Sequence, residues 1–198
     1  MLKRAFLLLF ITIYASVAWA QTADEMYEKY LDFNLARFEG RTNDALTLGE
    51  DILPDAEKLN AKPRISFYYS LGNLFENNSQ SVKALPLYEK VVAAVPDYYV
   101  GQRALAYMYG KQVDELSKKL NASQPNSAGY TQLYNQYVAQ LKKTLPHLEK
   151  AQACDPTPET LALIKSYYGL IKDTNGLKTL NTRLSAMSKT CIDLLDDK

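Results

Sequence analysis

Residues 65–97, ISFYYSLGNLFENNSQSVKALPLYEKVVAAVPD, decide the fold of this 198-residue chain. Apolar and small residues recur there at helical spacing in two runs, first Tyr68, Leu71, Gly72 and Phe75, and then Ala84, Tyr88 and Val91. The polar stretch 77–79 separates the runs, and Pro96 ends the second one. The pattern predicts two short antiparallel helices that approach closely at Gly72 and Ala84, because large side chains there would hold them apart.

The order and spacing of these residues resemble the tetratricopeptide repeat, a helix–turn–helix unit of roughly 34 residues. The resemblance is strong over 65–97, continues in enlarged form over 98–156, and weakens toward both ends of the chain. It implies a right-handed superhelical array of antiparallel helix pairs. In such arrays one stripe of the first helices lines a concave groove in which extended peptides lie.

The rest of the chain is also expected to be helical. No segment shows sustained apolar–polar alternation, so we predict an all-α fold of about eight helices. The first should span 22–38, begin with a capping box at Thr22 and Glu25, and carry one face made of Tyr27, Tyr30, Leu31, Leu35 and Phe38. Later helices should be capped by Asp97, by Thr157, and by Asp173 or Thr174.

Two similar strings indicate that one repeat is enlarged. KALPLYEK at 83–90 and KTLPHLEK at 143–150 lie 60 residues apart, about 26 more than the repeat length of roughly 34. The apolar stripe continues through the inserted residues. We therefore expect one longer hairpin within 98–156, with its tip at 121–129.

The N-terminus has the pattern of a secretory signal peptide. A basic start at Lys3 and Arg4 is followed by an apolar run over 5–17 and by Ala18-Trp19-Ala20, which predicts cleavage after Ala20 and a single exported domain over 21–198, periplasmic or secreted. A retained anchor is the alternative, although the run is short of the ~20 residues that span a bilayer. After cleavage 21 basic and 22 acidic residues remain, a near-neutral balance that argues against nucleic acid and anionic membranes as partners.

Few residues suit catalysis or metal binding. His147 is the only histidine, and the glycine-rich and nucleophile motifs of common enzymes are absent, so we expect no enzyme, no metal and no cofactor. Cys154 and Cys191 lie about one repeat apart near the ends of second helices, which predicts a disulfide in an exported chain. The alternative is a free thiol at Cys154 and a buried apolar side chain at Cys191.

The resemblance implies a protein–protein interaction scaffold, and the predicted signal peptide assigns it to the cell envelope or secretory space. The candidate peptide contacts lie at helical spacing beside the inward faces of two helices: Tyr69, Asn73, Arg103, Tyr107 and Lys111. They would offer tyrosines for stacking, an amide for a peptide backbone and cations for a carboxylate. The alternative for these five residues is that they are ordinary solvated positions. The alternatives for the whole chain are a self-associating structural subunit that pairs through the long hairpin, and an unrecognised small-ligand carrier or enzyme. The sequence does not identify the partner.

Overall fold

The computed structural model describes residues 22–125 and 127–195. The chain divides after Asn60 into two compact units. In the first unit, helices α2 (Ala23–Phe38) and α3 (Thr42–Ile52) are followed by the 3₁₀ helix η1 (Leu53–Lys58). The signal peptide and its cleavage site fall outside the described residues, and the single domain over 21–198 stays a prediction.

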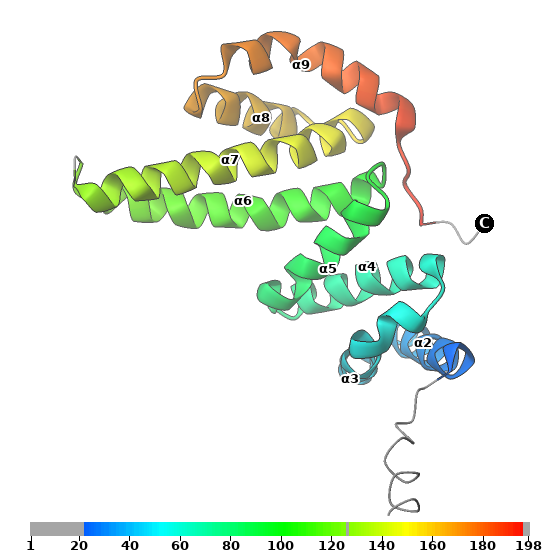
Figure 1. Ribbon diagram of the computed structural model, residues 1–198. Coiled ribbons are helices and arrows are strands. Elements are labelled where there is room, and N and C mark those ends of the chain that lie inside the picture. The colour runs from blue at the N-terminus through cyan, green and yellow to red at the C-terminus, as the bar shows by residue number, and fades with distance from the viewer. Residues whose placement is uncertain (1–21, 126, 196–198) are drawn as a thin grey trace, which may run out of the picture. The chain divides into compact units, whose positions relative to one another are not determined.

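The second unit holds the remaining helices in antiparallel succession (Figure 1). They are α4 (Ala61–Asn77), α5 (Ser81–Ala94), α6 (Tyr99–Asn121), α7 (Ala128–Cys154), α8 (Pro158–Leu170), α9 (Thr174–Met187) and the short η2 (Ser188–Thr190). Within the described ranges, β-structure amounts to one isolated bridge between Tyr98 and Ile192. The predicted all-α class is confirmed. No described helix is long and apolar enough to cross a membrane.

Helices α4 and α5 form the helix pair that the sequence predicts. Tyr68, Leu71, Phe75, Ala84 and Tyr88 are all buried. A Cβ atom added at Gly72 would lie 3.1 Å from Cε1 of Tyr88, so the absence of a side chain at Gly72 permits the close approach of the two helices. The close approach of two antiparallel helices that the sequence predicts is thus confirmed.

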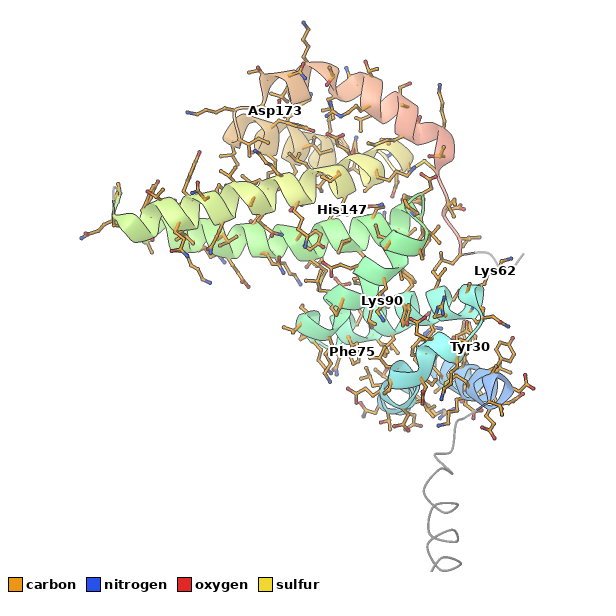
Figure 2. The ribbon with its side chains drawn as sticks, in the orientation of Figure 1. Tyr30, Lys62, Phe75, Lys90, His147 and Asp173 are labelled. Carbon is orange, nitrogen blue, oxygen red and sulfur yellow. A yellow bond between two sulfur atoms is a disulfide. The ribbon has the colours of Figure 1, made fainter. Side chains whose placement is uncertain are left out.

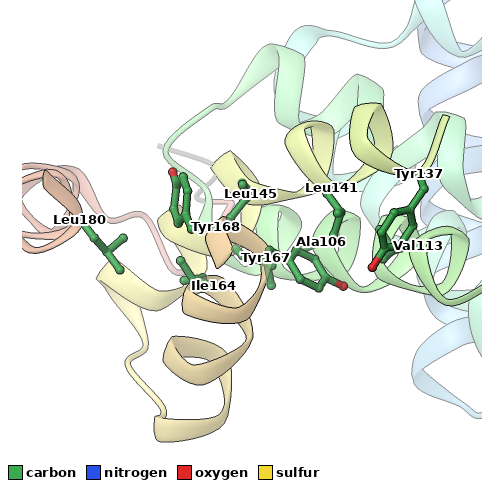
Figure 3. Packing of buried hydrophobic residues seen from close by; sticks show 10 residues of the cluster. Ala106, Val113, Tyr137, Leu141, Leu145, Ile164, Tyr167, Tyr168 and Leu180 are labelled. Carbon is green, nitrogen blue, oxygen red and sulfur yellow. The ribbon is translucent and has the colours of Figure 1, made fainter. Parts of the chain in front are cut away.

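The enlarged hairpin is also confirmed. Helix α6 has 23 residues and α7 has 27, against 17 for α4 and 14 for α5. Side by side in Figure 1, the two long helices reach beyond α8. Their facing sides join α8 and α9 in one core cluster (Figure 3), composed of Ala106, Val113, Tyr137, Leu141, Leu145, Leu148, Ile164, Tyr167, Tyr168 and Leu180.

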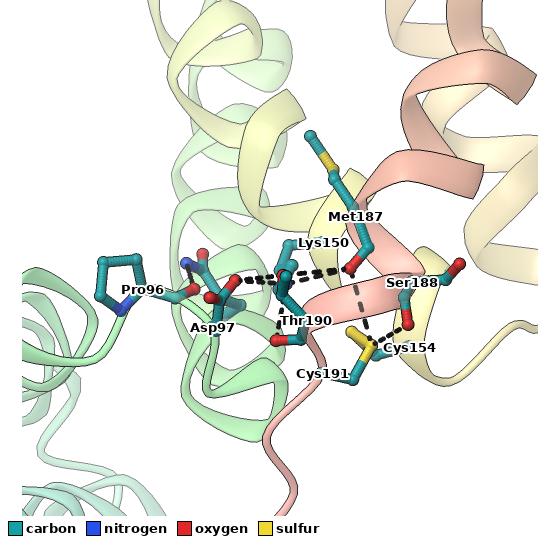
Figure 4. Close-up of polar contacts among 9 residues, drawn as sticks. Pro96, Asp97, Lys150, Cys154, Met187, Ser188, Thr190 and Cys191 are labelled. Carbon is teal, nitrogen blue, oxygen red and sulfur yellow. Dashed lines mark hydrogen bonds and ion pairs between the residues drawn. A yellow bond between two sulfur atoms is a disulfide. The ribbon is translucent and has the colours of Figure 1, made fainter.

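The segment after α9 is bound to the start of α6 (Figure 4). Cys191 forms a disulfide with Cys154 at the end of α7, with the two Cα atoms 5.6 Å apart. The amide of Ile192 donates to the carbonyl of Asp97 at 2.9 Å, and the amide of Tyr99 donates back to Ile192 at 3.1 Å. The C-terminal segment is therefore held by a covalent bond and by backbone hydrogen bonds.

Asp97 does not cap α6, so that prediction is wrong. The N-cap is Tyr98, which makes no side-chain capping bond. The carboxylate of Asp97 instead accepts hydrogen bonds from Nζ of Lys150 at 2.6 Å and from Oγ1 of Thr190 at 2.7 Å. Nζ of the buried Lys150 also donates to the carbonyl of Met187 at 3.1 Å. The Asp97 carboxylate, which local spacing assigns to the start of α6, thus forms a tertiary ion pair with Lys150 instead.

Helix α2 begins as predicted but buries a different face. The capping box is present, with Glu25 N donating to Thr22 Oγ1 at 3.2 Å and Thr22 N donating to Glu25 Oε2 at 3.0 Å. Of the expected face only Tyr30 is buried, and it joins a different set of inward residues, Met26, Phe33 and Ala36. The other members of the expected face, Tyr27, Leu31, Leu35 and Phe38, are exposed.

Candidate peptide-binding groove

An open groove of ≈ 320 Å³ lies where α6, α7 and α8 meet in the second unit. Helix α6 contributes six of its lining residues, α7 two and α8 three. Its lining residues are Arg103, Ala106, Tyr107, Gly110, Lys111, Asp114, Leu148, Ala151, Thr160, Leu163 and Tyr167.

The α6 side of the groove presents the predicted stripe. Arg103, Tyr107 and Lys111 follow one another at intervals of four residues, so their side chains share a helix face. Tyr107 is 56% exposed, and Nζ of Lys111 lies 4.4 Å from the centroid of its ring. The guanidinium of Arg103 forms an ion pair with Asp155 beyond the end of α7. The stripe thus combines one aromatic surface with two cations.

Small residues form part of the groove lining. Ala106 and Ala151 are buried on α6 and α7, and a Cβ atom at Gly110 would come within 3.9 Å of the Tyr167 hydroxyl. Figure 3 shows Tyr167 close to Ala106 in the core cluster. Burial raises the pKa of the Tyr167 phenol to about 12, with a further contribution from the negative charge of Asp114. This hydroxyl therefore stays neutral at physiological pH.

The α8 side adds apolar contact area. Leu163 is 40% exposed although it lines the groove, and Thr160 lies one turn before it with its hydroxyl accepting from that of Thr157 at 2.9 Å. A half-exposed leucine, an exposed tyrosine and small residues that line one groove leave apolar space that a ligand side chain can fill.

The structure separates the five predicted contact residues into two groups. Arg103, Tyr107 and Lys111 line the groove, whereas Tyr69 and Asn73 on α4 do not. The ring of Tyr69 packs edge-on against Tyr98, with centroids 5.2 Å apart. The amide oxygen of Asn73 accepts a hydrogen bond from Asn77 at 3.0 Å. The two α4 residues are thus engaged within the chain, away from the groove.

Sequence reasoning missed the other wall of the groove. Thr160, Leu163 and Tyr167 occur about fifty to sixty residues after the α6 stripe, and nothing local connects the two helices. The usable signal is the Tyr167–Tyr168 pair, because two adjacent residues of a helix point in different directions. Both rings are largely buried, yet Tyr167 lines the groove.

Metal-binding side chains do not cluster in the described ranges. These ranges hold no group of three or more His, Cys, Asp or Glu residues that suits a metal ion. His147 lies in α7, outside the groove lining (Figure 2), with Nδ1 2.5 Å from Oε1 of Gln102 and its ring 5.4 Å from that of Tyr109. Burial lowers the pKa of His147, and both cysteine thiols are consumed in the disulfide.

Comparisons with known proteins give little beyond this geometry. No family model matches the chain, and no curated protein matches it. Two solved structures are similar to it, the nearly identical TPR-like repeats of a putative kinesin light chain from Podosopora anserina and a single-substitution variant of the same protein. Each is 18% identical and covers 84% of this chain and 96% of its own, with TM-scores of 0.35 and 0.36. These scores are low, so the fold described above depends on the helices and contacts of this chain alone.

Proposed function

We propose that this chain is a protein-interaction scaffold that binds a peptide or protein segment in the groove between α6 and α8. The observation that carries the proposal is the convergence of Tyr107, Lys111 and Leu163, from two helices, on one open groove that small residues also line. Grooves of this kind bury an apolar anchor of the partner and orient it with a few polar groups.

The lining favours a segment that carries an apolar side chain next to a carboxylate. Leu163 and the ring of Tyr107 offer apolar area, and the ammonium of Lys111 lies over that ring at the groove's edge. A carboxylate placed there would gain a charge-assisted hydrogen bond without displacing Arg103 from Asp155.

We further propose that the chain acts outside the cytoplasm. Two features support this, the basic and then apolar start up to Ala20 and the joined pair Cys154 and Cys191. Disulfides persist mainly in the bacterial periplasm, in the secretory lumen and outside the cell. Fractionation of the native host would test the location directly: a full-length, uncleaved chain in the cytoplasm would contradict it.

The binding proposal is tested with peptides selected from a random display library on the purified chain. Fluorescence anisotropy then compares wild type with Tyr107→Ala, Leu163→Ala and Lys111→Glu. Each should weaken binding at least about fivefold, because loss of a central anchor costs more than about 1 kcal/mol. All three side chains lie at the surface of the groove, so helical circular dichroism should be unchanged.

Two control variants make the result specific. Tyr134→Ala removes a tyrosine on α7 that is exposed but lies outside the groove, and Asn73→Ala removes a candidate contact on α4. Both should bind the selected peptides as wild type does. If Tyr107→Ala binds normally while Asn73→Ala does not, the site is on α4 and the groove proposal fails. Light scattering that shows a stable oligomer, broken by substitutions in the hairpin, would favour the structural-subunit alternative.

A further inference from the structure

Helix α2 carries two apolar faces, and only one is used inside the first unit. Met26, Tyr30, Phe33 and Ala36 are buried on the side that contacts α3 and η1. A second row, Tyr27, Leu31, Leu35 and Phe38, runs along the helix at intervals of four, four and three residues, which places it on one stripe. We call this row the outer face of α2.

The outer face is open to solvent along its whole length. Its side chains are 45%, 43%, 51% and 82% exposed, in chain order from Tyr27 to Phe38. Four such side chains present on the order of 500 Å² of mostly apolar area, comparable with the largest patches of ordinary monomers, which are often functional. End helices of repeat arrays normally turn a polar face outward, so this first described helix departs from expectation.

A row of acidic residues borders the outer face on one edge. Asp24, Glu28 and Asp32 follow the same four-residue interval as the apolar row, so the two rows run in parallel. All three are exposed, and none forms an ion pair with another described residue. The other edge is closed by Arg37, which donates to Asn34 at 2.6 Å and lies 5.5 Å from the Phe38 ring centroid.

We propose that the outer face of α2 is a docking surface for an amphipathic helix of another protein, with an apolar row and a lysine- or arginine-rich edge. The apolar row supplies buried area, and the acidic row selects the charge and the direction of the partner helix. An anionic membrane is disfavoured because it would face the acidic row. An antiparallel pair of α2 helices from two copies is disfavoured because it would bring acidic row against acidic row.

Two synthetic helical peptides test the proposal. They share one leucine and phenylalanine row and differ only in the edge residues, lysine in one and glutamate in the other. The purified chain should bind the lysine peptide at least about tenfold more tightly by fluorescence anisotropy, and added salt should reduce that difference. Equal affinity for the two peptides, or no binding of either, would overturn the proposal.

Variants separate the two rows. Leu31→Ser/Leu35→Ser should abolish binding of the lysine peptide, whereas Leu170→Ser, at an equally exposed leucine of α8, should not. Glu28→Lys/Asp32→Lys should reverse the preference so that the glutamate peptide binds more tightly. An unchanged preference for the lysine peptide would mean that the acidic row plays no part and would overturn the proposal.

Two further measurements address the other occupants. Light scattering of the wild type should show a monomer; a dimer that Leu31→Ser/Leu35→Ser dissociates would identify a second copy as the occupant. Anionic vesicles should not bind; binding that the same variant removes would identify a lipid surface. Either result would overturn the proposal. The groove variant Tyr107→Ala should leave the peptide preference intact, so the two sites fail or succeed independently.

Discussion

Gly176→Ala should destabilise the chain although the residue lies in a helix, where alanine is normally preferred to glycine. A Cβ atom at this position would overlap Cε1 of Tyr168, and it would lie 2.6 Å from Cδ1 of the same ring and 2.8 Å from Oδ2 of Asp173. The Tyr168 ring cannot simply turn aside. Its hydroxyl donates to the buried carboxylate of Glu149 and accepts from Nη2 of Arg183 at 2.8 Å.

The size of the expected stability loss follows from the groups that the new methyl group would displace. Overpacking a fixed ring costs about 1–3 kcal/mol. Displacing Tyr168 also weakens its hydrogen bond to a charged group, worth about 1.5–3 kcal/mol. The higher helix propensity of alanine offsets at most about 1 kcal/mol of this loss. We therefore expect the free energy of unfolding to fall by about 2–4 kcal/mol.

Urea unfolding followed by circular dichroism measures this loss. Gly169→Ala is the matched control, since a Cβ atom there meets nothing within 4 Å, and it should leave stability unchanged or raise it by up to about 1 kcal/mol. In a Tyr168→Ala background the cost of Gly176→Ala should fall sharply, because the clashing ring is gone and only the Asp173 carboxylate must still shift. An unchanged unfolding midpoint for Gly176→Ala, or the same loss in both backgrounds, would refute the steric explanation.

Two other predictions concern the bonds that hold the C-terminal segment. Cys154→Ser/Cys191→Ser should lower the free energy of unfolding by about 4 kcal/mol, the chain-entropy value for a bridge across a separation of 37 residues, and dithiothreitol should then have no further effect in urea melts. The hydrogen bond from Lys150, followed by that from Thr190, lowers the pKa of Asp97, so its contribution to stability is present above the ordinary value of about 4 and is lost as the pH falls below it. Asp97→Asn should therefore show a smaller loss of stability than wild type between neutral pH and about pH 3; parallel pH profiles would contradict this.

Helix starts were predictable where the deciding contacts are local. Thr22 accepts from Glu25, Thr157 from Thr160 at 3.1 Å, and Asp173 from Gly176 at 2.7 Å, each three residues away. Asp97 has the same local chemistry but lies within reach of Lys150, 53 residues later, which offers a buried ammonium. The ion pair with Lys150 therefore replaces the capping hydrogen bond of Asp97. The sequence alone does not show that Lys150 will lie beside Asp97.

The groove was predictable on one side for the same reason. Periodicity placed Arg103, Tyr107 and Lys111 on one face of α6, and the structure keeps them together. The same periodicity does not bring Tyr69 to the groove, because its ring packs against Tyr98, the N-cap of α6. Leu163 lines the groove only because α8 packs on α7. No sequence motif signals that tertiary contact.

Helix α2 shows the limit of periodicity most clearly. A period of 3.6 residues identifies apolar stripes but does not say which stripe faces inward. Here Tyr30 and Phe33 contact the core while Leu31 and Leu35 do not, because α3 and η1 pack on one side alone. A partner that covers the outer face would gain about 25 cal/mol of binding free energy for each Å² of apolar area buried, before the cost of association. An apolar row of that size lies beside three carboxylates that form no ion pair within the described part of the chain. It is therefore better explained by a partner of opposite charge than by chance exposure.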